Sequence, residues 1–191
     1  EFSWFCEFST QIGKILTNKH FCFVENCFKA GVMKAAVIVY PGSNCDRDCK
    51  VAAETAVNAD VKMVWHKETH LSDDLDLIII PGGFSYGDYL RCGAMASVSP
   101  INAEILRHAE RGTSILGICN GFQILCEAGL LPGALLRNTN MKYNCKNVLL
   151  KPQTKESQLT RFVDTNKALK IPIAHGDGRY YCDADTLKTL Q

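Results

Sequence analysis

The chain lacks several features that would place it in a broad class of proteins. No apolar run approaches the roughly 18 residues that a membrane-spanning helix needs. The apolar patch at residues 21–24 is also shorter than the roughly 7–15 residues of a secretion-signal core. The 191 residues carry a formal net charge of +1, so the basic excess of an electrostatic nucleic-acid binder is missing as well. We therefore expect a cytoplasmic protein that binds neither membranes nor nucleic acid.

Cysteine pairs spaced as in zinc sites or redox motifs are also missing. The chain has ten cysteines, but none forms a CxxC pair, and without a secretion signal there is no reason to expect an oxidising compartment. We interpret them as reduced thiols, most of them buried as small apolar side chains, and expect no metal site. They are Cys6, Cys22, Cys27, Cys45, Cys49, Cys92, Cys119, Cys126, Cys145 and Cys182.

Residues 1–32 differ in character from the rest of the chain. Their aromatic residues and cysteines follow neither an alternating nor a helical pattern, whereas Met33 is followed almost directly by the apolar run AAVIVY. Many cytosolic domains open with a methionine before their first strand. We therefore interpret residues 1–32 as a non-native or upstream extension and residues 33–191 as the domain.

From Met33 onward, strand and helix patterns alternate. Short runs of apolar and β-branched residues predict buried strands, and apolar residues at helical spacing predict helices. This alternation is typical of an α/β fold, here an open, mostly parallel sheet flanked by helices. Strands are expected at residues 35–40, 61–65, 75–80, 113–118, 147–151 and 170–174, and helices at 46–56, 101–109, 120–128 and 183–190.

The stretch Gly117-Ile118-Cys119-Asn120-Gly121 lies between a predicted strand and a predicted helix. A nucleophile between two small residues at such a turn is typical of a nucleophile elbow, where strand and helix backbones pass too close for side chains. We expect the helix N-terminus to favour the Cys119 thiolate and lower its pKa, and the Asn120 N–H to donate to an oxyanion. The alternative is a buried cysteine beside packing glycines.

A glycine-rich stretch, PGGFSYGDYLRCGA, follows the preceding predicted strand at residues 81–94. Ligands of open α/β sheets bind at the carboxyl ends of the strands, so this stretch, at Pro81-Gly82-Gly83-Phe84, is placed to supply a second N–H beside Cys119. A simple turn is the alternative. Cys45 and Cys92 lie in loops near the strand ends, and we assign them structural roles. No GxGxxG follows the first strand, which argues against a dinucleotide site.

Several stretches resemble a known family. GICNGFQIL, at residues 117–125, is similar to the active-site stretch of class I (triad-type) glutamine amidotransferases. The chain resembles in particular the glutamine amidotransferase subunits of phosphoribosylformylglycinamidine synthase, from Met33 to its last residue, and this implies a flavodoxin-like three-layer sandwich. The further matching stretches are VYPGSNCD (39–46), PGGFSYGDYLRCGA (81–94), GLLPGALLRN (129–138) and AHGDGRY (174–180).

The resemblance implies a glutaminase. The Cys119 thiolate attacks the amide carbon of L-glutamine, and N–H groups near Gly83 and Asn120 hold the oxyanion. Gln123 and Phe84 contact the substrate. Ammonia passes to a large synthetase subunit, which works with a small accessory subunit and uses ATP to convert phosphoribosylformylglycinamide to the amidine. ATP and Mg²⁺ are expected on that synthetase, and this chain is expected to bind no cofactor.

The resemblance fails at the catalytic base. The family takes it from a His-Pro-Glu stretch near the carboxyl end, but no histidine of this chain precedes a proline. We interpret this as a missing carboxyl-terminal part or as lost glutaminase chemistry. His175 is the candidate for a substitute base at the edge of the site, with Asp177 where the family usually carries Glu. His108 is expected on a solvated, charged helix face.

Two other interpretations stay open. In the first, the chain is a PfpI-like cysteine hydrolase. Such hydrolases often carry His directly after the nucleophile, and Asn120 at that position counts against this interpretation. An amidotransferase-like module without activity would bind the synthetase and regulate it.

Overall fold

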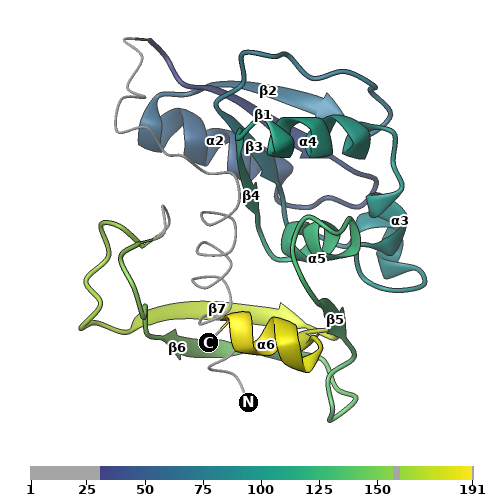
Figure 1. The fold of residues 1–191 in the computed structure, drawn as a ribbon, viewed down its shortest axis with the longest axis vertical. Helices are drawn as coiled ribbons and strands as arrows, with labels where there is room; N and C mark the ends of the chain where they lie inside the picture. Colours follow the sequence, from purple (N-terminus) through teal and green to yellow (C-terminus); the bar gives the residue numbers. More distant parts are fainter. Residues whose placement is uncertain (1–30, 157–159, 191) are drawn as a thin grey trace. The chain divides into compact units, whose positions relative to one another are not determined.

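The computed structural model describes residues 31–156 and 160–190 (Figure 1), and the chain divides into two compact units, each described here by itself. The first unit holds the described residues up to Leu131, and the second holds those from Pro132 onward. The interpretation of residues 1–32 as an extension falls outside the described residues, apart from Gly31 and Val32. The domain boundary at Met33 stays a prediction.

A parallel sheet of four strands forms the centre of the first unit. The strands are β1 (Lys34–Val39), β2 (Asp60–Trp65), β3 (Leu77–Ile80) and β4 (Ser114–Gly117), in the order β2-β1-β3-β4. All neighbouring pairs are parallel. The predicted strands are confirmed to within two residues at each end, because continuous apolar runs are what a sheet buried on both faces requires.

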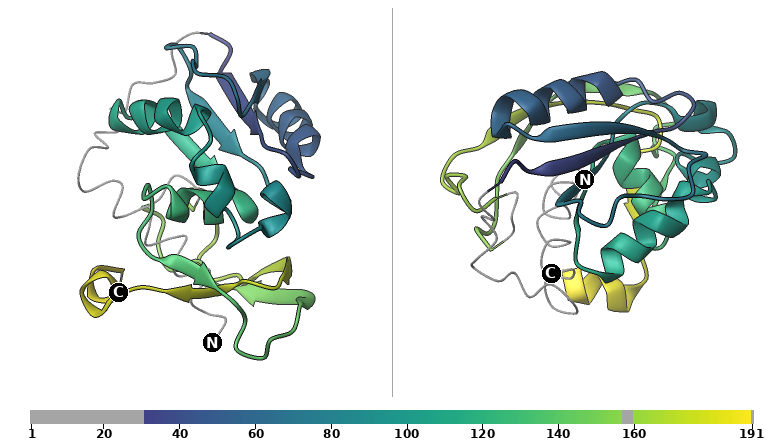
Figure 2. Two further views of the ribbon diagram at one scale, coloured as in Figure 1. Left: turned by 90° about the vertical axis from the view of Figure 1, so that its right-hand side faces the viewer. Right: turned by 90° about the horizontal axis from the view of Figure 1, so that it is seen from above.

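Helices cover both faces of this sheet, as the two views of Figure 2 show. Helix α2 (Asp46–Val57) packs on β1 and β2, where Ala35 and Val37 meet Cys49 and Ala53 in one buried cluster. Helices α4 (Ile101–Glu110) and α5 (Asn120–Glu127) lie on the opposite face. Successive strand residues point to opposite faces, so burial on both sides confirms the predicted three-layer α/β sandwich.

The glycine-rich stretch after β3 is not an open loop. It forms a 3₁₀ turn, η1 (Ser85–Asp88), and a short helix, α3 (Ala94–Ser97). Within η1, Tyr86 and Gly87 both have positive φ, +53° and +66°. The segment is therefore a specific compact structure whose shape the surrounding residues have to maintain.

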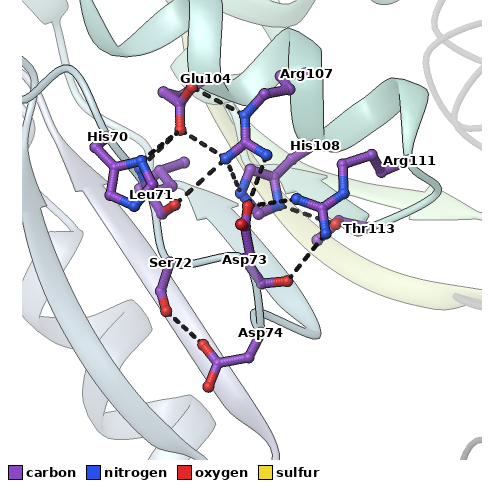
Figure 3. Close-up of polar contacts among 10 residues, drawn as sticks. All are labelled: His70, Leu71, Ser72, Asp73, Asp74, Glu104, Arg107, His108, Arg111 and Thr113. Carbon is purple, nitrogen blue, oxygen red and sulfur yellow. Dashed lines mark hydrogen bonds and ion pairs between the residues drawn. The ribbon is translucent and has the colours of Figure 1, made fainter.

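An ionic network ties α4 to the segment before β3 (Figure 3). The Arg107 guanidinium binds the carboxylates of Glu104 at 2.8 Å and Asp73 at 2.7 Å, and Arg111 also binds Asp73. The hydrogen bond from Arg107 lowers the pKa of Glu104 to about 2. The network holds residues 71–74 against the helix on the surface of the unit.

The expectation that His108 is solvated is wrong. Its side chain is fully buried, and its Nδ1 lies 3.0 Å from the Thr113 hydroxyl. Ile101, Ile105 and His108 stand four and three residues apart, so they share the face of α4 that packs on the sheet. Burial lowers the pKa of His108, and the neighbouring Arg107 and Arg111 lower it further.

The second unit is built from antiparallel pairs and one helix. Strands β6 (Asn144–Leu150) and β7 (Leu169–His175) form one ribbon, and β5 (Ala134–Leu136) pairs with β8 (Arg179–Tyr181). Helix α6 (Ala184–Leu190) follows. The two predicted strands and the predicted helix are confirmed, but the three-residue β5 and β8 carry too short a pattern to predict. Within the described part of the chain, no helix is long and apolar enough to cross a bilayer.

Candidate active site

The turn between β4 and α5 has the geometry of a nucleophile elbow. Cys119 has φ +53° and ψ −108°, a conformation unfavourable for a residue with a side chain. Ile118 donates its N–H to the Ile80 carbonyl at 2.9 Å, which keeps the turn on the end of β3. A Cβ on Gly121 would lie 2.0 Å from that same carbonyl oxygen. The close crossing of strand and helix therefore requires the glycine that the sequence motif contains.

The glycine-rich loop begins against this elbow. A Cβ built on Gly82 would lie 3.4 Å from the Cys119 Cβ, and the Gly82 carbonyl accepts N–H groups of Asn44 at 3.1 Å and Cys45 at 3.3 Å. The Phe84 N–H donates to the Gly42 carbonyl at 2.9 Å. Among the described residues, none accepts a hydrogen bond from the Gly83 N–H, so this donor stays available next to Gly82, the glycine that lies against the cysteine.

The environment of the Cys119 thiol is less favourable to thiolate than the sequence predicted. Part of the residue is exposed, but the surrounding loops withdraw water from the sulfur, and this partial burial raises the pKa of Cys119. A hydrogen bond from the Asn120 N–H works in the opposite direction, while Cys45 and Asp88 raise the pKa further. The predicted lowering of the pKa is wrong, because desolvation outweighs the hydrogen bond from the Asn120 N–H. Attack by this thiol needs a base.

The raised pKa has a direct consequence for alkylation. Because only the thiolate reacts, the rate of Cys119 modification by iodoacetamide should rise about 10-fold per pH unit between pH 6.5 and 8.5. Peptide mass spectrometry would follow Cys119, with glutathione alkylated in the same samples as the reference thiol. A rate that levels off below pH 7 would show instead that the thiolate forms readily.

Asn120 contributes its side chain as well as its backbone, which sequence reasoning missed. The side chain is 2% exposed, and its Oδ1 accepts the Ser85 N–H at 3.1 Å. Its Nδ2 donates to the Gln123 Oε1 at 2.9 Å and lies 3.4 Å from an Asp88 carboxylate oxygen. The amide thus connects the elbow helix to the glycine-rich loop. Contacts across 35 residues leave no local sequence signal.

The other residues predicted for the first unit lie on the two segments that meet at the elbow, α5 and the glycine-rich loop. Gln123 stands one helical turn after Asn120, and Phe84 directly follows Gly83, with its residue 45% exposed. The histidines of this unit bind elsewhere: His66 to Ser99, His70 to Glu104 and His108 to Thr113. The unit therefore holds the predicted nucleophile and both predicted oxyanion donors, while its histidines serve other contacts.

His175 and Asp177 belong to the second unit, at the end of β7. Asn138, which is 5% exposed, organises this turn: its Oδ1 lies 3.1 Å from His175 Nδ1 and accepts the Gly178 N–H at 3.0 Å. Its Nδ2 donates to the His175 carbonyl at 3.0 Å. Asp177 lies 3.5 Å from Arg137. Burial lowers the pKa of His175, with Asp177 acting in the opposite direction.

Across residues 31–156 and 160–190, no cluster of three or more His, Cys, Asp or Glu side chains is arranged to hold a metal ion.

Comparisons with known proteins place these features in a family context. Residues 32–191 match the CobB/CobQ-like glutamine amidotransferase domain. The chain is 57% identical over 159 residues to phosphoribosylformylglycinamidine synthase subunit PurQ of Roseobacter denitrificans, covering 83% of this chain and 71% of that one. The PurQ subunit of a Synechococcus strain is 51% identical over 162 residues, 85% of this chain and 71% of its own. A chain in the solved structure of PurLQS from Thermotoga maritima is 48% identical with a TM-score of 0.75, covering 81% of this chain and 72% of that one.

Proposed function

Since the chain belongs to the CobB/CobQ-like glutamine amidotransferase family, we propose that Cys119 is the nucleophile with which it releases ammonia from glutamine. The protein is the glutaminase subunit of phosphoribosylformylglycinamidine synthase, an enzyme of purine biosynthesis. The observation that carries the proposal for Cys119 is its position on the elbow, with the Asn120 N–H bonded to its sulfur and the Gly82–Gly83 backbone beside it.

The reaction follows from these groups. The sulfur attacks the side-chain amide carbon of glutamine, a C–S bond forms, and the carbonyl electron pair moves to oxygen. The N–H groups of Asn120 and Gly83 are the proposed donors to this oxyanion, which the surrounding loops keep in a poorly solvated place. As the intermediate collapses, the amide nitrogen takes up the proton that the thiol released and leaves as ammonia; water then cleaves the glutamyl thioester to glutamate and restores the thiol. Gln123 and Phe84 are proposed to contact the substrate.

The ammonia is used in a complex. The partners are a large synthetase subunit and a small accessory subunit, as in the PurLQS assembly of Thermotoga maritima. We propose that ATP and Mg²⁺ bind the synthetase and that this chain binds no cofactor. A cytoplasmic location is part of the same proposal.

The first experiment is covalent labelling of Cys119 by 6-diazo-5-oxo-norleucine, a glutamine analogue that alkylates an activated thiol with loss of nitrogen. We expect one label per chain by intact mass, assigned to the peptide containing Cys119. The matched controls are Cys119→Ala, which should take up no label, and Cys145→Ser, which removes another exposed thiol and should label normally.

A second protein in this experiment tests which residue is the catalytic base. In it, the chain continues after Gln191 with the carboxyl-terminal part of the Roseobacter denitrificans relative, where the family resemblance expects the His-Pro-Glu stretch. Labelling of the 191-residue chain that is lost in His175→Gln would support His175 as the base. Labelling only of the extended chain would assign that role to the added stretch. If neither protein labels at Cys119, the glutaminase proposal is wrong and the binding module is favoured.

A further inference from the structure

Tyr86 fastens the glycine-rich loop at a point away from the cysteine. Its backbone has φ +53° and ψ +27°, an unfavourable conformation for a tyrosine, and its N–H donates to the Pro41 carbonyl at 2.7 Å. The phenol oxygen lies 3.0 Å from His66 Nδ1 and 3.2 Å from the Ser99 hydroxyl. A strained residue of this kind persists only where its surroundings hold it.

His66 is held in a fixed orientation behind this tyrosine. It directly follows β2, its side chain is buried, and its ring centroid lies 4.5 Å from that of Trp65 and 6.1 Å from that of Tyr40. Nδ1 is also 3.2 Å from the Ser99 hydroxyl, so three polar atoms form a closed triangle. Since hydroxyl hydrogens rotate, Tyr86 and Ser99 can satisfy Nδ1 in either neutral tautomer. The other ring nitrogen, Nε2, is buried with no hydrogen-bond partner in the described part of the chain.

Tyr86 is a side-chain anchor of the segment that contains the oxyanion donor. Residues 82–85 are held through their backbones, at the Gly82 carbonyl, the Phe84 N–H and the Ser85 N–H. The Ser85 hydroxyl is buried and meets no hydrogen-bond partner among the described residues. The phenol of Tyr86 therefore connects this segment to the buried residues that follow β2 and α3.

We propose that His66 and Ser99 are positioning residues for the glutaminase reaction, which hold Tyr86 and thereby set the place of the Gly83 N–H and Phe84 relative to Cys119. They act through Tyr86 and touch no substrate. This inference rests on the proposed function of Cys119. It adds a buried triangle of three polar atoms, His66 Nδ1 and the hydroxyls of Tyr86 and Ser99, which is unrelated to the catalytic base. The position of the glycine-rich loop, with its Gly83 N–H, depends on this triangle.

The test compares Tyr86→Phe with Tyr89→Phe in the protein whose wild type labels at Cys119, either the 191-residue chain or the extended chain. Both variants remove one phenol oxygen from the same loop, but Tyr89 is 69% exposed. Tyr86→Phe should slow labelling of Cys119 by 6-diazo-5-oxo-norleucine about 10-fold, the upper range for a lost hydrogen bond. Labelling by iodoacetamide should be unchanged, because this alkylation forms no oxyanion and so does not use the Gly83 N–H. Tyr89→Phe should match the wild type in both reactions.

A second pair of variants tests His66 by atom position. Asparagine places a polar atom where Nδ1 lies, whereas glutamine extends its polar atoms toward the position of Nε2. His66→Asn should therefore retain most of the labelling rate that His66→Gln loses. Hydrogen exchange of peptides covering residues 82–90 should be faster in Tyr86→Phe and His66→Gln than in the wild type, while exchange in peptides from α2 stays unchanged.

The outcomes are distinct. Faster exchange in residues 82–90 together with slower glutamine-analogue labelling supports the inference. Unchanged exchange overturns it whether or not the wild type labels. Faster exchange with an unchanged labelling rate also overturns it, because the triangle would then hold the loop without serving the reaction. If neither the 191-residue nor the extended wild type labels, in a protein whose loop exchange responds as expected, the proposed function and the positioning role are rejected, while the contact itself stands.

Discussion

Serine in place of Cys119 is expected to lower glutamine-dependent turnover about 10³-fold or more, because a hydroxyl is a far weaker nucleophile than a thiol at the same position. The assay is amidine formation by the extended chain together with the synthetase and accessory subunits of the Roseobacter denitrificans enzyme. Glutamate release is measured in parallel.

Ammonium chloride provides the internal control for this variant. Supplied in place of glutamine, it should support equal synthesis with the Cys119→Ser and the unaltered protein, since the synthetase consumes ammonia from either source. Cys145→Ser, in the second unit, should behave like the unaltered protein. Retention of more than about a tenth of glutamine-dependent turnover would contradict nucleophilic catalysis by Cys119.

Alanine at Gly121 is expected to cost about 3 kcal/mol in the free energy of unfolding, at the upper end for an overpacked site. The added Cβ would lie 2.0 Å from the Ile80 carbonyl oxygen and 2.7 Å from its carbonyl carbon. These are backbone atoms at the end of a buried strand, so strand and helix would have to separate. Urea unfolding measures the loss, and labelling of Cys119 by 6-diazo-5-oxo-norleucine should fall with it.

Gly112→Ala is the matched control for this substitution. Gly112 has φ +85°, but no atom lies within 4 Å of a Cβ placed there. This variant should lose only the roughly 1 kcal/mol of an unfavourable backbone conformation and should label normally. If Gly121→Ala were no less stable than Gly112→Ala, the close approach of the strand and helix backbones would not be the reason for glycine at position 121.

The two largest corrections to the sequence-based picture concern the state of side chains within elements that were predicted well. The helix containing His108 was expected within one residue of its observed end, yet the histidine is buried where it was thought to be solvated. The elbow was placed correctly, yet the pKa of its thiol moves in the unexpected direction. Each depends on what folding packs around the side chain: burial for the histidine, and burial together with Cys45 and Asp88 for the thiol.

The sequence by itself determined the parallel α/β unit, the elbow at Cys119 and the glycine-rich loop before it. These features follow from local patterns: apolar runs form buried strands, and glycines mark backbones that cross closely. Only the tertiary structure decided that Asn120 binds the loop through its side chain and that His66 and Ser99 hold Tyr86. Those contacts join residues 13 to 35 positions apart, and each depends on where folding places a polar atom, which no periodicity of the chain encodes.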